Sequence, residues 1–420
     1  MKWLHLQLNS STLLGARKSE ETIEETSTVR DGDKTMSLGH SGFGDVLAQV
    51  RRLAPLVAEH RQSIDRERRL PEALFEACAD AGLFRLWLPK ALGGPELSPL
   101  EFMGVVEAVA QLDGSVGWLV GNGGGMGRVA GYLPETVARA WFDDRRAFVA
   151  SATGAIGSAV PVKGGYRVSG RWPFGSGAHH ATHFMGLCNI ADPDGGNTSG
   201  PICCYFAREH VTIIDNWHVS GLRGTGSCDF EVRELLVPSE HVHPLLDHPA
   251  TQPGLLYRMP AMSVFAWTVA VVPLGVARAA ADAFAELATT KMRAGTSAPL
   301  RDREIIQSEF GRADAQLRAG RAFLRDAMSE VIVATDVGGE RLVRARATLR
   351  TACTYAAENA VQITDRLSAA AGAVAIFETC RLERCVRDVH AAVKHAAMSP
   401  NNYVVSGRVG LGLAPGTARF

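Results

Sequence analysis

Two short, glycine-rich corners carry side chains that could do chemistry. The first is the stretch RWPFGSGAHH, residues 171–180, in which Gly175 and Gly177 enclose Ser176 after a strand-like run. Glycines let a backbone turn tightly, so the serine hydroxyl is the chemical group that this corner presents. The alternative is a β-bulge or hairpin in which the protein itself satisfies that hydroxyl.

The second corner is GLRGTGSCDF, residues 221–230, where three glycines surround Arg223, Thr225 and Ser227. Backbone amides and hydroxyls in such a loop can point at one bound group. A dinucleotide-binding fingerprint would open a helix, whereas a strand pattern follows this loop, so we do not interpret it as a nucleotide motif. An ordinary turn between two strands is the competing interpretation.

A third group of candidate residues is HHATH, in which His179, His180 and His183 suggest a metal site. A strand would point the first two side chains to opposite faces, and no carboxylate or cysteine in the stretch completes a ligand set. The eight cysteines contain no CxxC pair, which is typical of reduced thiols in a cytosolic protein. We therefore predict no metal.

Composition excludes several classes of function. The 420 residues are 46% hydrophobic, and 44 basic residues balance 44 acidic ones. A neutral chain without basic clusters has no field to attract nucleic acid or an anionic membrane. The sequence has no apolar run of signal-peptide length at its start and none of the roughly 18 residues that a membrane span needs. We expect a soluble, cytoplasmic protein.

The apolar periodicity divides the chain into four parts. Residues 1–40 are rich in Ser, Thr and charged residues and poor in aromatics, which predicts a flexible tail. Helical spacing predicts an N-terminal helical domain over 41–152. Short β-branched and aromatic runs predict a sandwich-like or barrel-like β domain over 153–247, and long helical segments predict a four-helix bundle over 248–420. The predicted fold class is α+β, mostly α.

Six stretches in order, PKALGG, DGSVGW, RWPFGSG, HVSGLRGTGSCDF, LLVP and LERCVRDVHA, make the chain resemble the acyl-CoA dehydrogenase fold, and specifically its flavin-dependent monooxygenase branch. The resemblance implies that the Trp-containing strand and the loop after it lie along a flavin. It also implies that Arg293 contacts the flavin phosphate and that Gly372 approaches the cofactor from a neighbouring subunit. The implied flavin-binding residues are Trp172, Phe174, Gly175, Ser176, Arg223, Thr225, Ser227, Arg293 and Gly372.

The same resemblance distinguishes two reactions. Acyl-CoA dehydrogenases remove a substrate proton with a glutamate, commonly nine residues past the arginine of an RDA-like motif. Arg387 and Asp388 match that motif, but the ninth position holds Ala396, and no carboxylate follows through Tyr403. His395 stands next to that position, where monooxygenases of this fold carry a histidine beside flavin and substrate. A dehydrogenase with its base on another helix remains the alternative.

The resemblance thus implies the oxygenase component of a two-component system. A separate NAD(P)H-dependent reductase would supply FMNH2, with FADH2 less favoured, and O2 would give a flavin hydroperoxide that hydroxylates a small aromatic or polycyclic molecule. Imidazole suits proton transfer near neutral pH, so His395 is the predicted base, and Ser176 is predicted to stabilise the flavin intermediate. N- or S-oxygenation and a non-catalytic assembly protein are the alternatives.

The remaining predictions concern the substrate pocket and assembly. We predict a pocket lined by Trp87, Trp118, Asn122 and Phe265. Residues 265–280 are apolar on too many sides for a surface helix, which favours a homotetramer. On one continuous helix, His390 and His395 would lie about 140° apart, so both cannot face the flavin.

Overall fold

The structure is a computed structural model that describes residues 42–191, 200–246, 248–264, 268–292, 295, 297–417 and 420. The predicted tail over 1–40 lies outside the described residues, as do the two predicted site residues Phe265 and Arg293. No helix in the described part of the chain combines the length and apolarity that a membrane span requires.

Five helices open the described chain, within the range over which the periodicity predicts a helical domain. Their starts follow ordinary capping chemistry: the Ser98 hydroxyl accepts from the Glu101 N–H in a capping box, and the Asp113 carboxylate accepts from the N–H groups of Ser115 and Val116. The helices are α1 (Phe43–Glu67), α2 (Glu72–Asp80), α3 (Pro99–Leu112), α4 (Gly114–Met126) and α5 (Glu135–Phe142).

Helix α4 has a glycine-rich sequence, GSVGWLVGNGGGM, that gives no helical signal. The glycines permit very close packing instead. A Cβ at Gly117 would lie 2.5 Å from Ala110 of α3, and one at Gly123 would lie 2.3 Å from the Phe148 ring. Helix α4 is therefore buried along most of its length, between α3 and the sheet. It carries Trp118 and Asn122 into the interior.

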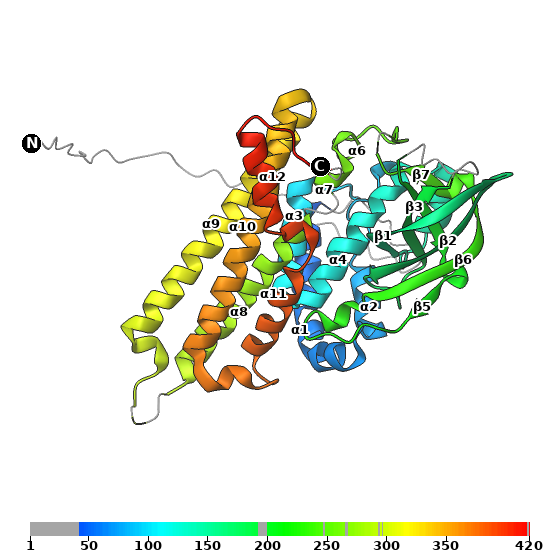
Figure 1. Cartoon of the computed structure of the whole chain (residues 1–420). Helices are drawn as coiled ribbons and strands as arrows, with labels where there is room; N and C mark the ends of the chain where they lie inside the picture. Colours follow the sequence, from blue (N-terminus) through cyan, green and yellow to red (C-terminus); the bar gives the residue numbers. More distant parts are fainter. Residues whose placement is uncertain are drawn as a thin grey trace, which may run out of the picture. The chain divides into compact units, whose positions relative to one another are not determined.

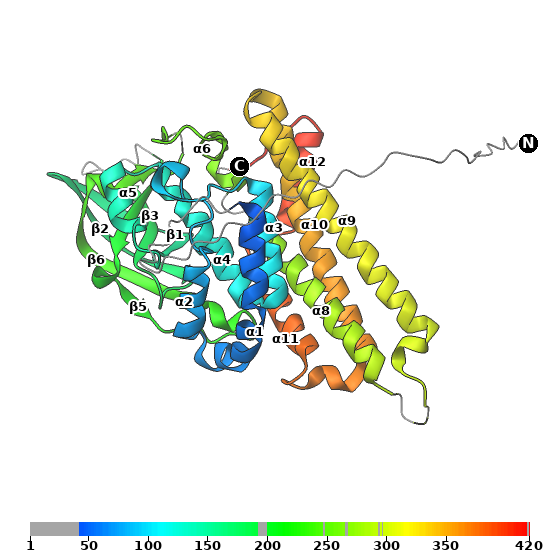
Figure 2. The ribbon, with the colours of Figure 1, turned by 180° about the vertical axis from the view of Figure 1, so that it is seen from behind.

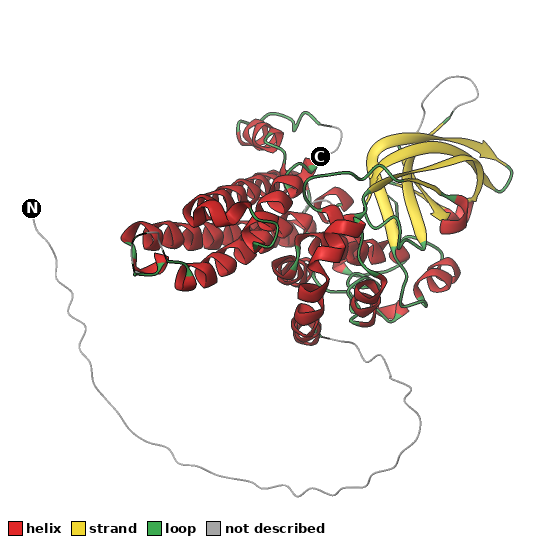
Figure 3. Cartoon of the chain, turned by 90° about the horizontal axis from the view of Figure 1, so that it is seen from below, coloured by secondary structure: helices red, strands yellow, loops and turns green. Residues whose placement is uncertain are grey.

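The middle of the chain forms a seven-stranded sheet in the order β5-β6-β2-β1-β3-β4-β7, drawn in yellow in Figure 3. Neighbouring strands are antiparallel, except that β1 and β3 are parallel. The strands are β1 (Val149–Val162), β2 (Gly165–Gly175), β3 (His183–Ile190), β4 (Ile202–Ala207), β5 (Thr212–Ile214), β6 (Cys228–Pro238) and β7 (Val242–Pro244).

Trp172 of β2 anchors the interior of this sheet. Its indole N–H donates to the Leu187 carbonyl at 2.8 Å, and its side chain is fully buried. A Cβ at Gly157, Gly170 or Gly186 would lie within 2.6 Å of the indole, so these glycines make the space that the ring fills. The Trp172 side chain is thus committed to the core.

Long helices form the other half of the molecule, side by side in Figures 1 and 2. Helix α8 packs on α3, α10 and α11, which explains why its sequence is apolar around most of its circumference. The mostly α fold with a β region in the middle confirms the predicted fold class. The helices are α6 (Leu255–Arg258), α7 (Ala261–Val264), α8 (Val271–Thr290), α9 (Glu304–Thr335), α10 (Gly339–Ala371), α11 (Arg381–Ala392) and α12 (Asn401–Gly410).

A buried ion network ties α11 to the N-terminal helices. The Arg384 guanidinium lies 2.8 Å from the carboxylates of Asp65 and Asp113 and 3.7 Å from that of Asp388. Asp388 in turn accepts a 2.7 Å hydrogen bond from the backbone N–H of Leu222. The network therefore fixes the loop over 221–227, one of the two corners that the sequence singled out.

Candidate active site

The two glycine-rich corners meet through a chain of hydrogen-bonded hydroxyls. The Trp118 indole N–H donates to the Ser176 hydroxyl at 3.1 Å, and Ser176 Oγ lies 2.8 Å from Ser227 Oγ. Ser227 Oγ lies 2.7 Å from Thr225 Oγ1, which donates to the Leu222 carbonyl at 2.9 Å. All three hydroxyl-bearing residues are buried.

The groups at the two ends of this row of hydroxyls determine which atom donates in each of its hydrogen bonds. A carbonyl can only accept, so the Thr225 proton is used on Leu222, and Ser227 must donate to Thr225. Ser176 must then donate to Ser227, while it accepts from Trp118. The Ser176 oxygen has one further lone pair. Its remaining capacity is therefore to accept a hydrogen bond.

His395 lies against the same tryptophan, with its ring edge-on to Trp118 at a centroid distance of 5.6 Å. Predicting that His395 belongs to the helix of His390 was wrong, because α11 ends at Ala392. His395 instead caps the short turn η9 (Ala396–Met398), and its Nδ1 accepts from the Ala397 N–H at 3.2 Å. In the neutral ring the proton therefore sits on Nε2.

Burial lowers the pKa of His395 to about 4. The imidazole is thus neutral at pH 7, and its free nitrogen carries a hydrogen. This corrects the expectation of a base that titrates near neutral pH: in this tautomer Nε2 is a hydrogen-bond donor. His390 faces elsewhere, since its Nε2 lies 2.9 Å from the exposed carboxylate of Asp365.

Phe174 marks the open side of the first corner. Its φ of +64° is unusual for a residue with a side chain, and its ring is 65% exposed. The neighbouring glycines make room for the protein's own side chains. A Cβ at Gly175 would lie 2.8 Å from the Phe230 ring, and one at Gly177 would lie 2.5 Å from the Phe148 ring. The protein's own core requires both glycines.

The other predicted site residues have varied surroundings. Arg223 donates to the Asp65 carbonyl at 3.0 Å, and Gly372 ends α10 with a φ of +68°. Asn122 is half-buried and donates to the Trp118 carbonyl at 2.8 Å. Trp87 is fully buried and stacks on Phe102 at 4.0 Å, so it is a core residue rather than part of a pocket wall.

These groups fit a reduced flavin. A reduced flavin has three fused rings and would present a ring N–H to the protein. Phe174 offers an exposed ring, Ser176 an oxygen able to accept, and His395 a neutral N–H donor beside the same Trp118. Ser176 and His395 come from segments more than 200 residues apart, and the fold brings both to one tryptophan.

The histidines of HHATH separate. His180 stacks on Phe75 at 4.3 Å, and His183 stacks on Trp141 at 4.2 Å. His179 meets two residues that sequence spacing could not reveal, namely Cys228 at 3.5 Å from its Nε2 and, in the same cluster, Asp215. The side chain of Arg68 already binds both Asp215 oxygens, at 2.6 and 2.7 Å.

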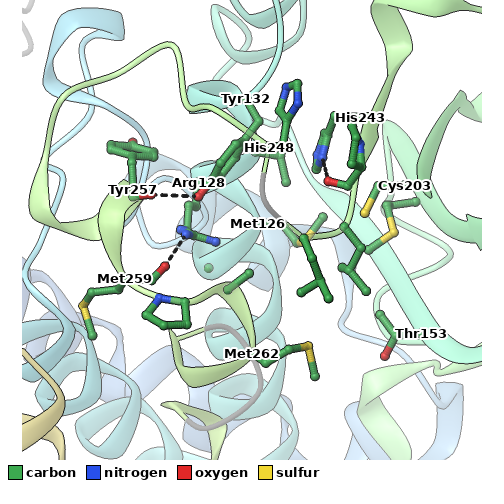
Figure 4. Close-up of a pocket in the computed structure, with 18 of the residues that line it drawn as sticks. Met126, Arg128, Tyr132, Thr153, Cys203, His243, His248, Tyr257, Met259 and Met262 are labelled. Atoms are coloured by element: carbon green, nitrogen blue, oxygen red, sulfur yellow. Dashed lines mark hydrogen bonds between the residues drawn. The ribbon is translucent and has the colours of Figure 1, made fainter. Parts of the chain in front are cut away.

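A cavity of about 480 Å³ lies where α4, the sheet and α6–α7 meet (Figure 4). Helix α4 lines it with Gly125 and Met126, the turn after Asn122. Its apolar wall includes Val129, Met185, Leu245, Leu246, Met259 and Met262, and its polar residues include Arg128, Tyr132, Tyr205, His243, His248, Tyr257 and Arg346.

Sequence reasoning missed this cavity. None of Trp87, Trp118 and Asn122 lines it, and Phe265 lies outside the described residues. The lining residues come from eight separate segments without a common motif, so no spacing pattern marks them. The one available signal was Arg128, a charged residue in the otherwise uncharged run from 114 to 134.

Comparisons with known proteins identify the family of this fold. Residues 45–142 match the acyl-CoA dehydrogenase N-terminal domain, and residues 267–400 match the acyl-CoA dehydrogenase C-terminal domain. An indole-3-acetate monooxygenase of Pseudomonas putida is 29% identical over 356 residues, which cover 84% of this chain and 90% of that protein.

Two further similarities concern flavin-dependent proteins. HsaA of Mycobacterium tuberculosis (strain CDC 1551 / Oshkosh), a flavin-dependent monooxygenase oxygenase subunit, is 30% identical over 382 residues, covering 88% of this chain and 96% of that protein. The solved structure of XiaF from Streptomyces sp. in complex with FADH2 and glycerol has a TM-score of 0.82 at 26% identity. It covers 89% of this chain and 97% of that one.

Proposed function

This chain belongs to the acyl-CoA dehydrogenase family, in its flavin-dependent monooxygenase branch, and we propose on that basis that it is the oxygenase component of a two-component system. A separate NAD(P)H-dependent reductase would supply reduced flavin, as FMNH2 or, as the second form, FADH2. Reduced flavin activates O2 and transfers one oxygen atom. The proposed substrate is an aromatic or polycyclic molecule, by analogy with the indole-3-acetate monooxygenase.

The observation that carries this proposal is the meeting of Ser176 and His395 at Trp118. Ser176 would accept a hydrogen bond from the reduced ring, and the bonds to Ser227 and Thr225 orient its lone pair for that purpose. His395 would donate its Nε2–H to an oxygen of the substrate. Both roles use the protonation states that the hydrogen bonds and burial favour at pH 7.

Desaturation of an acyl-CoA is less well supported. That reaction needs a carboxylate base, and the turn η9 that occupies the expected position consists of Ala396, Ala397 and Met398. A homotetramer remains part of the proposal. Ile376 and Phe377, which follow Gly372 at the end of α10, are 75% and 59% exposed, as residues that contact another subunit would be in an isolated chain.

The test is anaerobic titration of the purified protein with FMNH2, and separately with FADH2, followed by mixing with O2. We expect the reduced form to bind more tightly than the oxidised form and O2 to be consumed more slowly than by free reduced flavin. Purification with tightly bound oxidised FAD that an acyl-CoA reduces would instead identify a dehydrogenase.

Substitution of Ser176 tests the assigned residue. Ser176→Ala removes the accepting oxygen, so hydrogen peroxide should be released about 10-fold faster or more when the loaded protein meets O2. Ser169→Ala is the matched control, because Ser169 lies on the same strand β2 and bonds the exposed Glu234 at 2.7 Å. Equal peroxide release by both variants would remove Ser176 from the site.

A further inference from the structure

The charges that line the cavity beside α4 are unbalanced. Its described lining includes three arginines and two histidines but neither aspartate nor glutamate. Arg258 is neutralised from outside the cavity, by Asp336 at 3.2 Å. Neither Arg128 nor Arg346 forms an ion pair with any described residue. Two cations thus line one cavity, and no aspartate or glutamate side chain in the described part of its lining supplies their counter-charge.

Arg128 is the more deeply placed of the two, and Figure 4 shows it at the centre of the cavity wall. Its side chain is 5% exposed. Nε donates to the Leu256 carbonyl at 3.1 Å and Nη2 to the Met259 carbonyl at 3.2 Å, which fixes the plane of the guanidinium. Burial lowers the pKa of Arg128, and the groups that act to raise it are tyrosines rather than carboxylates.

A buried cation is costly unless a partner of opposite charge compensates it. The guanidinium has five N–H donors, and these two carbonyls use two of them. The planar fork that remains matches a carboxylate, which it can bind with two parallel hydrogen bonds. The hydroxyl of Tyr257, another lining residue, is buried and has no partner among the described residues, so it is a further donor.

Arg346 approaches from the helical half of the molecule. Its Nε donates to the Ser263 hydroxyl at 2.9 Å, and its guanidinium lies 4.5 Å from the centre of the Phe420 ring. Burial lowers the pKa of Arg346 as well. The second cation therefore adds to the positive potential of the cavity while its side chain is held by neutral groups.

The remaining wall suits an apolar body. Met126, Met185, Met259 and Met262 contribute flexible, polarisable side chains that adapt to large flat molecules. The volume of about 480 Å³ is within the range for ligands of several fused or linked rings. Helix α4 advances about 1.5 Å per residue, so Met126 lies roughly 12 Å along the helix from Trp118. The cavity thus lies about two helical turns beyond Trp118 on the same helix.

We propose that this cavity binds an aromatic carboxylic acid of polycyclic size, with its carboxylate on Arg128. This inference rests on the proposed function, because it names the class of molecule that the oxygenase acts on. The ring system lies toward Trp118 and the acid toward Arg128, and Arg346 strengthens the attraction from the opposite wall.

Calorimetric binding to the flavin-free protein tests this proposal with matched pairs of probes. Each pair is an arylacetic acid (phenylacetic, naphthylacetic or phenanthrenylacetic acid) and its uncharged amide. We expect at least one acid of the two larger ring systems to bind about 10-fold or more tightly than its amide. Arg128→Gln should lower the affinity for that acid to the affinity for its amide, and it should leave the affinity for the amide unchanged.

Arg258→Gln is the matched control, because Arg258 lines the same cavity but is already paired with Asp336. It should keep the preference for the acid, and Arg346→Gln should reduce it about 2- to 5-fold through the longer-range charge alone. Arg128→Lys keeps the charge and loses the planar fork, so an intermediate preference is expected. Arg128→Lys also replaces Arg128→Gln as the test variant if Arg128→Gln does not fold.

Four results would overturn the proposal. The first is equal affinity for acid and amide in every pair, and the second is an unchanged preference in both Arg128 variants. The third is 2-naphthyl phosphate binding more tightly than the anion of 2-naphthylacetic acid, which would indicate a phosphate ester. Asp247 lies outside the described residues, so the variant Asp247→Asn is measured as well. A preference for the acid over its amide that appears only in this variant would mean that the Asp247 carboxylate neutralises the cavity in the wild type, and it would overturn the proposal.

The assay also separates this proposal from the proposed function. Because no flavin is present, acid binding that depends on Arg128 would stand even if the protein failed to bind FMNH2 and FADH2. Conversely, the protein with bound reduced flavin could consume O2 slowly while the flavin-free protein binds acid and amide with equal affinity. That result would support the proposed oxygenase function and reject the carboxylate site.

Discussion

Arg384 and Arg128 are both buried arginines, 7% and 5% exposed, but they have opposite surroundings. Arg384 meets the carboxylates of Asp65, Asp113 and Asp388. Although burial opposes its charge, Asp113, Asp388 and Asp65 raise the pKa of Arg384. Arg128 has two neutral carbonyls, and burial lowers its pKa.

The difference indicates separate roles for the two arginines. A buried charge with its partners in the protein is part of the fold, because removing it leaves those partners unpaired. A buried charge that lines a cavity and lacks a partner is completed by a ligand. The network around Arg384 holds helices and the 221–227 loop together, whereas Arg128 leaves an ionic interaction for the substrate to make.

The largest expected effect follows from breaking the network. Arg384→Met should lower the free energy of unfolding by about 3–5 kcal/mol, because the buried carboxylates of Asp113 and Asp388 lose their cation, whereas Asp65 keeps Arg387 at 2.9 Å. Urea denaturation followed by circular dichroism measures the loss.

Arg128→Met is the paired measurement. The variant loses two hydrogen bonds to carbonyls but also an uncompensated buried cation, so its unfolding free energy should stay within about 1 kcal/mol of the wild type. Equal losses in both variants would mean that Arg128 is also a structural residue and that the contrast is false.

The sequence predicted the order of the elements because periodicity depends on local burial. Helical spacing before α5, short strands between β1 and β7, and long helices afterwards are each visible within a window of about fifteen residues. Helix α4 was missed for the opposite reason. Its glycines have poor helix propensity, and their value lies in contacts such as that of Gly117 with Ala110, which only the assembled fold reveals.

The site was partly predictable for the same physical reason. Ser176, Thr225 and Ser227 were found because each lies in a compact glycine-rich corner. The hydrogen bonds between the corners could not be found, since they join residues about 50 positions apart. The tautomer and the low pKa of His395 depend on the end of α11 and on burial, neither of which a helical pattern reports.

The two regions should also respond to acid in opposite directions. Burial lowers the pKa of His243, beside the cavity, and of His183 to about 4. As the pH falls, these histidines therefore bind protons in the unfolded chain before they do so in the folded protein. Their protonation lowers the stability of the folded protein between about pH 6.5 and pH 4. Burial raises the pKa of Asp388 to about 7, so the folded network takes up a proton first and gains stability over the range from 7 to 4.

Because several buried histidines oppose one carboxyl group, the net stability should fall between pH 7 and pH 5. Thermal melts at the two pH values measure it. His183→Phe keeps the stack on Trp141 and removes one titrating group, so the fall should shrink by about 2 kcal/mol. Asp388→Asn should steepen the fall. A pH dependence unchanged in both variants would contradict this assignment of the two regions.

The smallest expected effect comes from a neutral hydrogen bond at the cavity wall. His243 Nδ1 lies 2.8 Å from the Pro244 carbonyl and must donate to it, so Nε2 accepts from the Tyr205 hydroxyl, also at 2.8 Å. Tyr205→Phe leaves Nε2 without a donor and should cost about 1 kcal/mol of unfolding free energy. Tyr403→Phe is the control, because the Tyr403 hydroxyl bonds the exposed carboxylate of Glu358 and its loss should cost less than about 0.5 kcal/mol. Equal, negligible losses in the two variants would mean that the polar wall of the cavity is solvated like the surface, and Arg128 would then need no ligand to complete it.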